Sequence, residues 1–425
     1  MSKIIGVSTA NIDNISGLGA SGGGGGYDPV AGTGTFTETV PTSGLLRVGG
    51  YRDDTPSGYR FGPSPQVLFS SDEDGKYLCA QLSSSTAWTK VAVFSYGMTN
   101  DNGTYAINSS GELWGIGYNS NYGPSTWSQI VKTGVSSTGW TDIDSAGNTV
   151  LAINSGKLYY LGNKQYAGDG TGSSYVNFAQ VGEDDDWVSI SCGYQHSLAI
   201  KGTDRKVYAT GYNSNGRTGQ GTTSGSLTSW TLVDATNLDN ATNEDITHIQ
   251  AAYETSLIVQ NGKAFFFGYN RYNQNAGMNT GTYSTPTQIG KDSGTFKTDW
   301  SHGYAGNYTC HLIDTSGRLW WAGAGNYGAG ASGSTSNQNN GNFAQIGSDT
   351  NWQEIKSSNN AFSGQMGFTA RKGGYGYYWG RNDYSNIIDS STSPITTPTL
   401  IKSGTCGTVT GMIGAGPQFI VGNFS

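Results

Sequence analysis

Residues able to do acid–base or metal chemistry are few in this 425-residue chain, and they lie far apart. Four histidines are present, and none lies in an HExxH motif or at another close metal-ligand spacing. A single histidine in a β-rich repeat is more often a hydrogen-bonding core residue than a catalyst, so we expect structural roles. The histidines are His196, His248, His302 and His311.

Three short motifs match known site patterns only by their letters. Residues 323–328 read GxGxxG, but they follow an antiparallel strand and no helix is expected after them, so they do not predict a phosphate site. Residues 19–23 read GxSxG inside a glycine-rich stretch, where no strained elbow can form. The carboxylate run 183–186 lacks the ligand spacing of a calcium loop, so we expect a solvated loop, with calcium binding as the alternative. We predict no enzyme activity, no metal and no cofactor.

The residues best suited to bind a ligand are aromatic and amide side chains in Gly/Asn-rich loops. Tyr-Asn or Arg-Asn pairs recur at one position of successive sequence repeats, at residues 118–119, 212–213, 269–270 and 381–382. An aromatic ring offers contact area at low entropy cost and the amide hydrogen-bonds, which suits sugars and polar protein surfaces. The alternative is structural, because Asn after Gly tolerates a left-handed turn and Tyr can pack between repeats. The candidate ligand-binding residues are Tyr118, Tyr122, Trp127, Tyr166, Tyr212, Tyr269, Tyr272 and Arg381.

These loops belong to a unit that recurs six times along the chain. Each unit has an apolar run, a short polar turn with Gly, and a second run that ends in an aromatic residue and Gly. The copies cover residues 104–119, 151–163, 197–213, 256–270, 311–323 and 367–382. A tryptophan usually opens the unit, at Trp88, Trp140, Trp187, Trp300 and Trp352, and a period near fifty residues is typical of propellers and solenoids. Because one hairpin cannot bury its apolar face alone, we predict a ring of four-stranded blades.

Both ends of the chain hold half of a further unit. Residues 417–422 resemble the first strand of the repeated hairpin, and residues 44–51 resemble an orphan second strand. Pairing the two would remove the free edges of an open array. We therefore predict an all-β fold, a seven-bladed β-propeller over residues 44–425 with one blade closed by both termini. An N-terminal anchor at residues 1–20 and a Gly-rich linker at residues 21–43 would precede it.

The first twenty residues lie outside the repeat and have a pattern of their own. Ile4, Gly6 and Val7 recur eleven residues later as Ile15, Gly17 and Leu18, and residues 22–26 are all glycine, which is typical of a flexible spacer. This layout predicts a docking peptide on a tether; the alternative is a frayed terminus without a partner. The predicted assembly-anchor residues are Ile4, Ile5, Val7, Ile12, Ile15 and Leu18.

Composition narrows the possible partners. A net charge of −7 with only 23 Lys and Arg argues against nucleic acid, whose binding depends on cations placed against phosphates. No apolar run is long enough for a membrane span and no signal peptide is evident, so we expect synthesis in a cytosol. The four cysteines form no CxxC pair, and we expect them to be buried at equivalent blade positions. They are Cys79, Cys192, Cys310 and Cys406.

Residues 187–221 carry the fullest resemblance to a known family. Trp187, the run from His196 to Ile200, and the segment from Lys206 to Gly221 resemble the regulator of chromosome condensation repeat family. The resemblance implies a seven-bladed propeller with a blade completed by both termini. The family's functions range from nucleotide exchange on small GTPases to enzyme inhibition and sugar recognition, so the fold does not decide the function.

The head of the chain resembles, over about twenty residues, the N-terminal peptides of tailed-phage structural proteins. There, short Ile-x-Gly-Val units precede a Gly-rich stretch and a variable β domain, so the resemblance implies a bacteriophage virion structural protein. We predict a non-enzymatic tail-fibre, adhesin or decoration module located on the virion and present in several copies or as a homo-oligomer. Its expected partners are other virion proteins, through the N-terminus, and a host surface glycan or protein. The alternatives are a cellular scaffold of the same family, which regulates a GTPase or inhibits an enzyme, and a polysaccharide-cleaving spike.

Overall fold

The structure is a computed structural model of the 425-residue chain. It describes the side chains of residues 88–93, 103–117, 123–124, 127–147, 149–170, 178–276, 279–306, 308–338, 341–357, 367–382 and 393–401, together with the backbone of short strands outside these ranges. The six predicted anchor residues, Tyr118 and Tyr122 lie outside the described residues. In the head only two short paired strands are described, Ser2–Lys3 (β1) and Thr35–Phe36 (β2).

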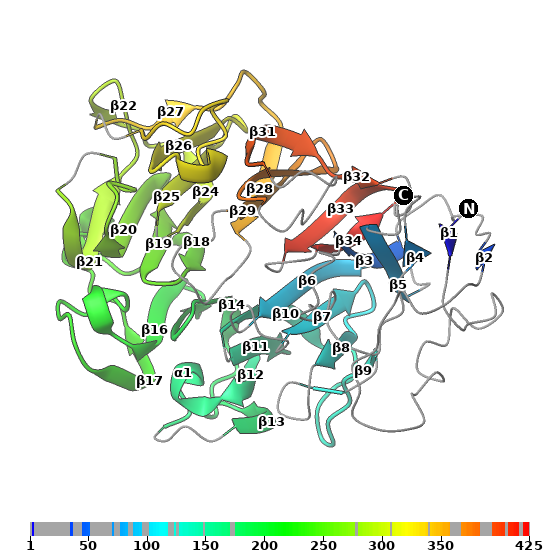
Figure 1. Cartoon of the computed structure of the whole chain (residues 1–425). Helices are drawn as coiled ribbons and strands as arrows, with labels where there is room; N and C mark the ends of the chain where they lie inside the picture. The colour runs from blue at the N-terminus through cyan, green and yellow to red at the C-terminus, as the bar shows by residue number, and fades with distance from the viewer. Residues whose placement is uncertain are drawn as a thin grey trace.

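Six four-stranded antiparallel units, which we call blades 1 to 6, are arranged in a ring within the described part of the chain (Figure 1). Blade 1 contains β6 (Trp88–Ser95), β7 (Asn102–Asn108), β8 (Leu113–Gly117) and β9 (Ser128–Gln129). Blade 2 contains β10 (Trp140–Ala146), β11 (Thr149–Asn154), β12 (Lys157–Asn163) and β13 (Tyr175–Gln180). Blade 3 contains β14 (Trp187–Cys192), β15 (His196–Lys201), β16 (Lys206–Tyr212) and β17 (Ser226–Leu232).

The second half of the ring repeats this order. Blade 4 contains β18 (Ile246–Ala251), β19 (Thr255–Gln260), β20 (Lys263–Asn270) and β21 (Gly281–Ile289). Blade 5 contains β24 (Trp300–Ala305), β25 (Thr309–Asp314), β26 (Leu319–Gly323) and β27 (Ala344–Gln345). Blade 6 contains β28 (Trp352–Ser357), β29 (Gly367–Lys372), β30 (Tyr375–Gly380) and β31 (Ile395–Leu400). The predicted all-β propeller architecture is confirmed, and each of the six sequence copies forms one blade.

A further sheet joins the two ends of the chain. Its strands follow the order β33 (Gly407–Ala415), β34 (Ile420–Phe424), β3 (Leu45–Tyr51), β5 (Tyr77–Ser83) and β4 (Ser70–Ser71). β3 pairs antiparallel with β34, with Val48 opposite Val421. β32 (Lys402–Ser403) pairs with β33. The two segments predicted to complement each other are therefore hydrogen-bonded neighbours.

Helical structure is confined to single turns in the described residues. These are α1 (Lys164–Ala167) and the 3₁₀ turns η2 (Ser214–Gly216), η3 (Asp239–Ala241) and η4 (Asn326–Gly328). One small hairpin, β22 (Lys291–Asp292) with β23 (Thr295–Phe296), lies between blades 4 and 5.

The up-and-down order of each blade decides where its loops lie. The turn between strands one and two and the loop between strands three and four lie at one end of the ring, which we call the loop face. The turn between strands two and three and the connection to the next blade lie at the other end, which we call the turn face. Loops that are far apart in the sequence therefore gather on one surface.

Aromatic side chains build the core of each blade. The opening Trp140 is 3% exposed and packs edge to face against Tyr159 of the third strand, with ring centroids 5.4 Å apart. Phe178 of the fourth strand packs against the same indole at 5.9 Å. Blade 5 repeats this arrangement around Trp300, which is 1% exposed. The regular tryptophan spacing thus reflects one aromatic cluster per blade.

Lysines cover several opening tryptophans on the turn face, a feature that the sequence pattern did not predict. The ammonium of Lys201 lies 5.4 Å from the Trp187 ring centroid, and that of Lys372 lies 5.0 Å from the Trp352 ring. Lys297 lies 5.3 Å from Trp300 and 4.9 Å from Trp320. Such cation–π contacts tie the connection between blades to the aromatic core.

The described cysteines correct one expectation. Cys192 and Cys310 are buried and free, as predicted. They do not occupy equivalent positions, because Cys192 ends a first strand whereas Cys310 lies in a second strand. Cys79 and Cys406 lie outside the residues whose side chains are described.

Candidate functional site

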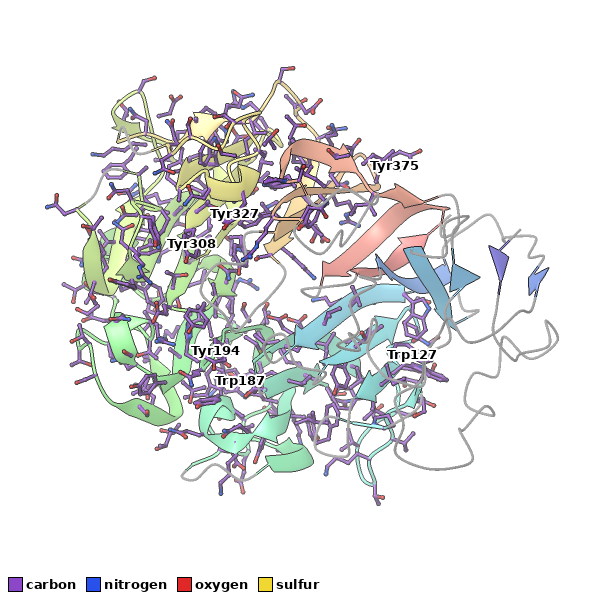
Figure 2. The ribbon with its side chains drawn as sticks, viewed as in Figure 1. Trp127, Trp187, Tyr194, Tyr308, Tyr327 and Tyr375 are labelled. Carbon is purple, nitrogen blue, oxygen red and sulfur yellow. The ribbon has the colours of Figure 1, made fainter. Side chains whose placement is uncertain are left out.

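Aromatic contacts on the loop face cross the boundaries between blades. Tyr194 follows the first strand of blade 3 and stacks on Tyr253, which follows the first strand of blade 4, with centroids 4.9 Å apart and planes inclined by 16°. Tyr272, from the third-to-fourth-strand loop of blade 4, stacks on Tyr308 of blade 5 at 4.5 Å and 21°. Figure 2 shows Tyr194 and Tyr308 with the side chains of their blades. The boundary between two blades is therefore lined by aromatic rings at this face.

Arginine side chains join these contacts. The Arg381 guanidinium lies 4.9 Å from the Tyr327 ring centroid, and Arg271 lies 5.6 Å from the Tyr272 ring. Arg217 is only 3% exposed and is held differently: its Nη1 donates to the Tyr253 carbonyl at 3.1 Å, and its Nη2 lies 3.6 Å from a Glu254 oxygen. Arg217 therefore links blades 3 and 4 from inside, whereas Arg271 and Arg381 accompany rings at the surface.

The two faces differ in charge. In the described turns and loops of the loop face, the charged side chains are Lys164, Asp169, Arg217, Glu254, Arg271 and Arg381. The turn face holds the acidic run at residues 183–186 and the lysines that cover the tryptophans. In its described turns and loops, the loop face is accordingly rich in tyrosine and amides and poor in charge.

The predicted binding residues are only partly brought together. Tyr212, Tyr269, Tyr272 and Arg381 lie at the loop face, and Tyr212 is 41% exposed. Tyr166 lies there on α1, where its hydroxyl accepts a hydrogen bond from the Gln195 amide at 3.3 Å. Trp127 lies elsewhere, because its ring packs 5.7 Å from that of Trp88 inside blade 1.

The asparagines that follow these tyrosines have structural bonds. Asn213 is 2% exposed; its oxygen accepts from the Thr218 backbone N–H at 3.1 Å, and its Nδ2 donates to the Thr222 hydroxyl at 2.9 Å. Asn270 is fully buried, and its Nδ2 donates to the Asn279 carbonyl at 3.0 Å. These amides hold the third-to-fourth-strand loops together from within. Asn213 and Asn270 therefore have the structural role that was the alternative to ligand binding.

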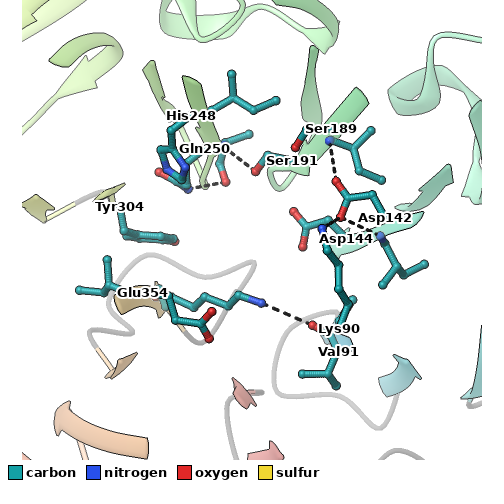
Figure 3. A pocket seen from close by; sticks show the side chains of 18 of the residues that line it. Lys90, Val91, Asp142, Asp144, Ser189, Ser191, His248, Gln250, Tyr304 and Glu354 are labelled. Atoms are coloured by element: carbon teal, nitrogen blue, oxygen red, sulfur yellow. Dashed lines mark hydrogen bonds and ion pairs between the residues drawn. The ribbon is translucent and has the colours of Figure 1, made fainter. Parts of the chain in front are cut away.

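The first strands of the six blades line a central channel with a cavity of about 310 Å³ (Figure 3). In all six, the register shifts one residue after the opening position, so a β-bulge re-aims the next side chains. Because the first strand is also a free sheet edge, its backbone groups need other partners. Besides the loop face, the channel is therefore a second place where polar side chains from different blades meet.

Side chains from one first strand satisfy backbone groups of the next. At equivalent positions, Asp144 accepts from the Cys192 N–H at 2.8 Å, Ser191 from the Ala251 N–H at 3.0 Å, and Gln250 from the Ala305 N–H at 2.8 Å. These residues lie 48, 60 and 55 positions from their partners in the sequence. The channel polar groups therefore connect neighbouring blades, a role that spacing in the sequence cannot show.

Three ionisable side chains of the channel, Asp142, Asp144 and His248, are also held by partners. Asp142 forms an ion pair with Lys90 and accepts from the Ile190 N–H at 3.1 Å. Burial raises the pKa of the Asp144 carboxyl above its usual range. Burial lowers the pKa of His248 to about 4, with a further contribution from His302, and His248 Nε2 lies 2.9 Å from the Gly303 carbonyl. Two carboxylates on one strand could suggest acid–base chemistry, but each is bonded to the neighbouring blade.

Two serine–histidine contacts occur in the described side chains: Ser301 Oγ lies 2.8 Å from Nδ1 of the adjacent His302, and a longer-range contact joins blades 3 and 4 and is structural in geometry. His196 Nε2 lies 2.9 Å from Ser256 Oγ, which itself donates to the Arg217 carbonyl at 2.8 Å. Both side chains are buried. Since the serine proton is already donated to a carbonyl, the imidazole must donate its Nε2 proton to the hydroxyl oxygen, the reverse of nucleophile activation. The contact joins blades 3 and 4.

The described residues contain no cluster of three or more His, Cys, Asp or Glu side chains placed to hold a metal ion. Within the acidic run, Asp184 and Asp186 instead lie 2.8 and 3.9 Å from the Lys201 ammonium. No helix in the described part of the chain has the length and apolar character needed to cross a membrane.

Comparison with known proteins agrees with this architecture. Residues 187–217, which span the first three strands and the 3₁₀ turn of blade 3, match the regulator of chromosome condensation (RCC1) repeat. The chain is similar in structure to human WBSCR16, with 16% identity and a TM-score of 0.66 over 91% of this chain and 99% of that one. It is similar to Prp20p of Saccharomyces cerevisiae, with 12% identity and a TM-score of 0.61 over 91% and 92% of the two chains. A second structure of yeast Prp20, bound to Kap60, matches with 13% identity and a TM-score of 0.63 over 90% and 89%.

The ring of blades defines an all-β propeller. Residues 187–217 match the regulator of chromosome condensation repeat, and the chain shares its fold with two solved structures over about nine-tenths of its length. At these identities the structural likeness establishes the fold and leaves the function to be argued from this chain's own surface.

Proposed function

We propose that this chain is a non-enzymatic structural protein of a tailed-phage virion, which displays the propeller at the particle surface and binds a host surface glycan or protein through the loop face. The observation that supports binding at this face is the set of aromatic contacts across blade boundaries, such as Tyr194 on Tyr253 and Tyr272 on Tyr308. Stacked rings are held rigid, so a ligand that contacts them loses little side-chain entropy on binding.

The non-enzymatic role is supported by the hydrogen bonds of the buried histidine, serine and aspartate side chains. His196, Ser256, Asp142 and Asp144 each connect one blade to the next. A group that stabilises the ring in this way is not available to exchange protons with a substrate without weakening the fold.

We further propose that the sheet β33-β34-β3-β5 is a seventh blade, completed by both ends of the chain. Two contacts support this: β33 contacts β6 of blade 1 on one side and β28 of blade 6 on the other. A blade at this place closes the ring and leaves no blade face uncovered. The virion location is proposed from the sequence of residues 1–26, with the repeated apolar pattern as anchor and the glycine run as tether.

The virion role is tested by deleting residues 1–26 from the gene in its native genome and analysing purified particles by mass spectrometry. The full chain is expected in particles, and the shortened chain is expected to fold, by circular dichroism, but to be missing from them. Binding is tested with the labelled full-length protein on host cells. Absence of the intact protein from all particles would overturn the virion role.

A cellular scaffold of the same repeat family is the second candidate. The specific observation in its favour is the match of residues 187–217 to the family repeat. Recovery of the full-length protein from cell extracts in a stable complex with a GTPase or an enzyme, and never in particles, would favour this candidate.

A further inference from the structure

Tyr327 has a backbone conformation that is costly for its residue type. It lies in the 3₁₀ turn η4 with φ +56° and ψ +21°, in the left-handed region. Left-handed φ is uncommon for residues other than Gly and Asn, and for a bulky residue it is a genuine outlier. At the corresponding position of blade 3, the residue with φ +61° is Asn215, which tolerates this conformation.

The side chain of Tyr327 gains little from burial in return. This large aromatic side chain is 40% exposed (Figure 2). Strain of this kind persists where the surrounding structure enforces it, and it concentrates at binding sites. The strained backbone together with the exposed ring makes Tyr327 a candidate for ligand contact.

Tyr327 belongs to a row of three tyrosines with an arginine at each end, across blades 4, 5 and 6. Arg271 lies 5.6 Å from the Tyr272 ring, Tyr272 stacks on Tyr308 at 4.5 Å, and Arg381 lies 4.9 Å from the Tyr327 ring. Burial raises the pKa of Tyr308, and Tyr272 and Tyr327 are both close enough to raise it further. We call these five residues the Arg–Tyr row.

The charge of the row is opposite to that of the whole chain. The chain has a net charge of −7, yet the row has two arginines and no carboxylate. The two described carboxylates of the loop face are engaged elsewhere: Glu254 accepts from Asn215 at 3.3 Å, and Asp169 accepts from the Tyr160 hydroxyl at 2.7 Å. No described carboxylate forms an ion pair with Arg271.

We infer that the Arg–Tyr row binds an anionic polysaccharide, with sugar rings packed on the tyrosines and a carboxylate group paired with the guanidinium group of Arg271. This inference rests on the proposed binding role of the loop face and specifies its ligand. The C–H faces of sugars pack against aromatic rings, and a planar guanidinium matches a carboxylate with two hydrogen bonds. A row that extends over three blades suits a chain-like ligand better than a single small molecule.

The test uses the purified full-length protein with alginate, hyaluronate and polygalacturonate. Each polysaccharide is compared with its carboxyl-reduced form, in which the carboxylates have become alcohols while the sugar backbone is retained. Calorimetric titration is expected to show binding of at least one acidic polymer, weakened about tenfold or more after reduction. Binding of the reduced polymers with equal affinity, or of none of the acidic polymers, overturns the inference.

Two variants and a matched control locate the site. Tyr327→Asn places the residue of blade 3 at the strained position, so it is expected to raise the melting temperature while weakening polysaccharide binding about tenfold. Arg271→Gln is expected to weaken binding of the acidic polymer and not of its reduced form. Tyr375→Asn removes a tyrosine that is 48% exposed on the turn face, and it should leave binding unchanged.

The outcomes separate this inference from the proposed function. If Tyr327→Asn and Arg271→Gln bind the acidic polymers as the unaltered chain does, the Arg–Tyr row is not the site. If the full-length protein binds host cells but no acidic polymer, the loop face binds a neutral glycan or a protein, and only the ligand class is wrong. If it binds neither, the proposed binding role fails as well.

Discussion

The lysines that cover the opening tryptophans offer a graded test of what holds the blades together. Lys201 and Lys372 end the second strands of blades 3 and 6, and Lys297 precedes the first strand of blade 5; each has aromatic and carboxylate partners. Replacement of each lysine by methionine keeps most of the aliphatic packing and removes only the charge. The comparison therefore isolates the electrostatic part of the contact.

The surroundings of the three lysines predict unequal losses. At Lys201 and Lys372 the partner carboxylates of Asp184 and Asp349 are 53% and 50% exposed, so their ion pairs contribute little. We expect each of these variants to lose about 1 kcal/mol of stability, mainly from the cation–π contact. Lys297 lies 3.6 Å from Asp314, whose side chain is completely buried. Because Lys297→Met removes one partner of a buried charge, we expect a loss of about 2–3 kcal/mol.

Urea unfolding followed by tryptophan fluorescence measures these differences, at low ionic strength and again at about 1 M salt. The loss for Lys297→Met is expected to persist in salt, because the buried pair is screened less than the exposed pairs. Asp314 keeps Arg318 Nε at 2.8 Å and Trp320 Nε1 at 3.0 Å, so the variant should still fold. Equal losses at the three sites, or the largest loss at Lys201, would refute the reasoning.

Three further predictions concern the contacts between blades and the loop-face turns. Ser256→Ala leaves the buried His196 ring without its hydroxyl partner, so we expect a loss of about 1–3 kcal/mol in urea unfolding, and a loss within error would contradict the structural role. Asn213→Ala removes the amide that shapes its loop, so the melting temperature should fall and amide exchange should accelerate between residues 213 and 225; unchanged exchange there would contradict it. The pKa of His248 is lowered by burial to about 4, below the value near 6.5 of an unfolded chain. This group therefore adds stability above about pH 6.5, and as the pH falls from there toward about 4 that stability decreases by about 1.4 kcal/mol per unit. His248→Gln should make the acid slope shallower, and an unchanged slope in urea unfolding at several pH values would count against this account.

The repeat pattern was enough to predict the blades because the information is local. An opening tryptophan, two apolar runs and a short turn recur, and each copy became the four-stranded unit that its periodicity indicated, for example β10 to β13 after Trp140. Blade 4 opens with Ile246 in place of tryptophan, and its hairpin pattern alone identified it. In the five blades that open with tryptophan, burial of the same aromatic cluster requires the same residue type at the same spacing, which is why the sequence shows it.

The site depended on contacts between residues that the sequence separates widely. Trp127 is an aromatic residue in a loop, like the tyrosines predicted to bind a ligand, but it packs inside blade 1. Its partner Trp88 comes from another strand, so the sequence around Trp127 does not show this contact. The left-handed conformation of Tyr327 and the closeness of Arg381 to it follow from how blades 5 and 6 pack. The pairing of Asp144 with the Cys192 N–H, or of His196 with Ser256, likewise exists only once the ring closes. Local periodicity determined the strands and their order, whereas the geometry of the surface and of the channel was decided by tertiary packing, because the curvature of the ring alone sets which loops become neighbours.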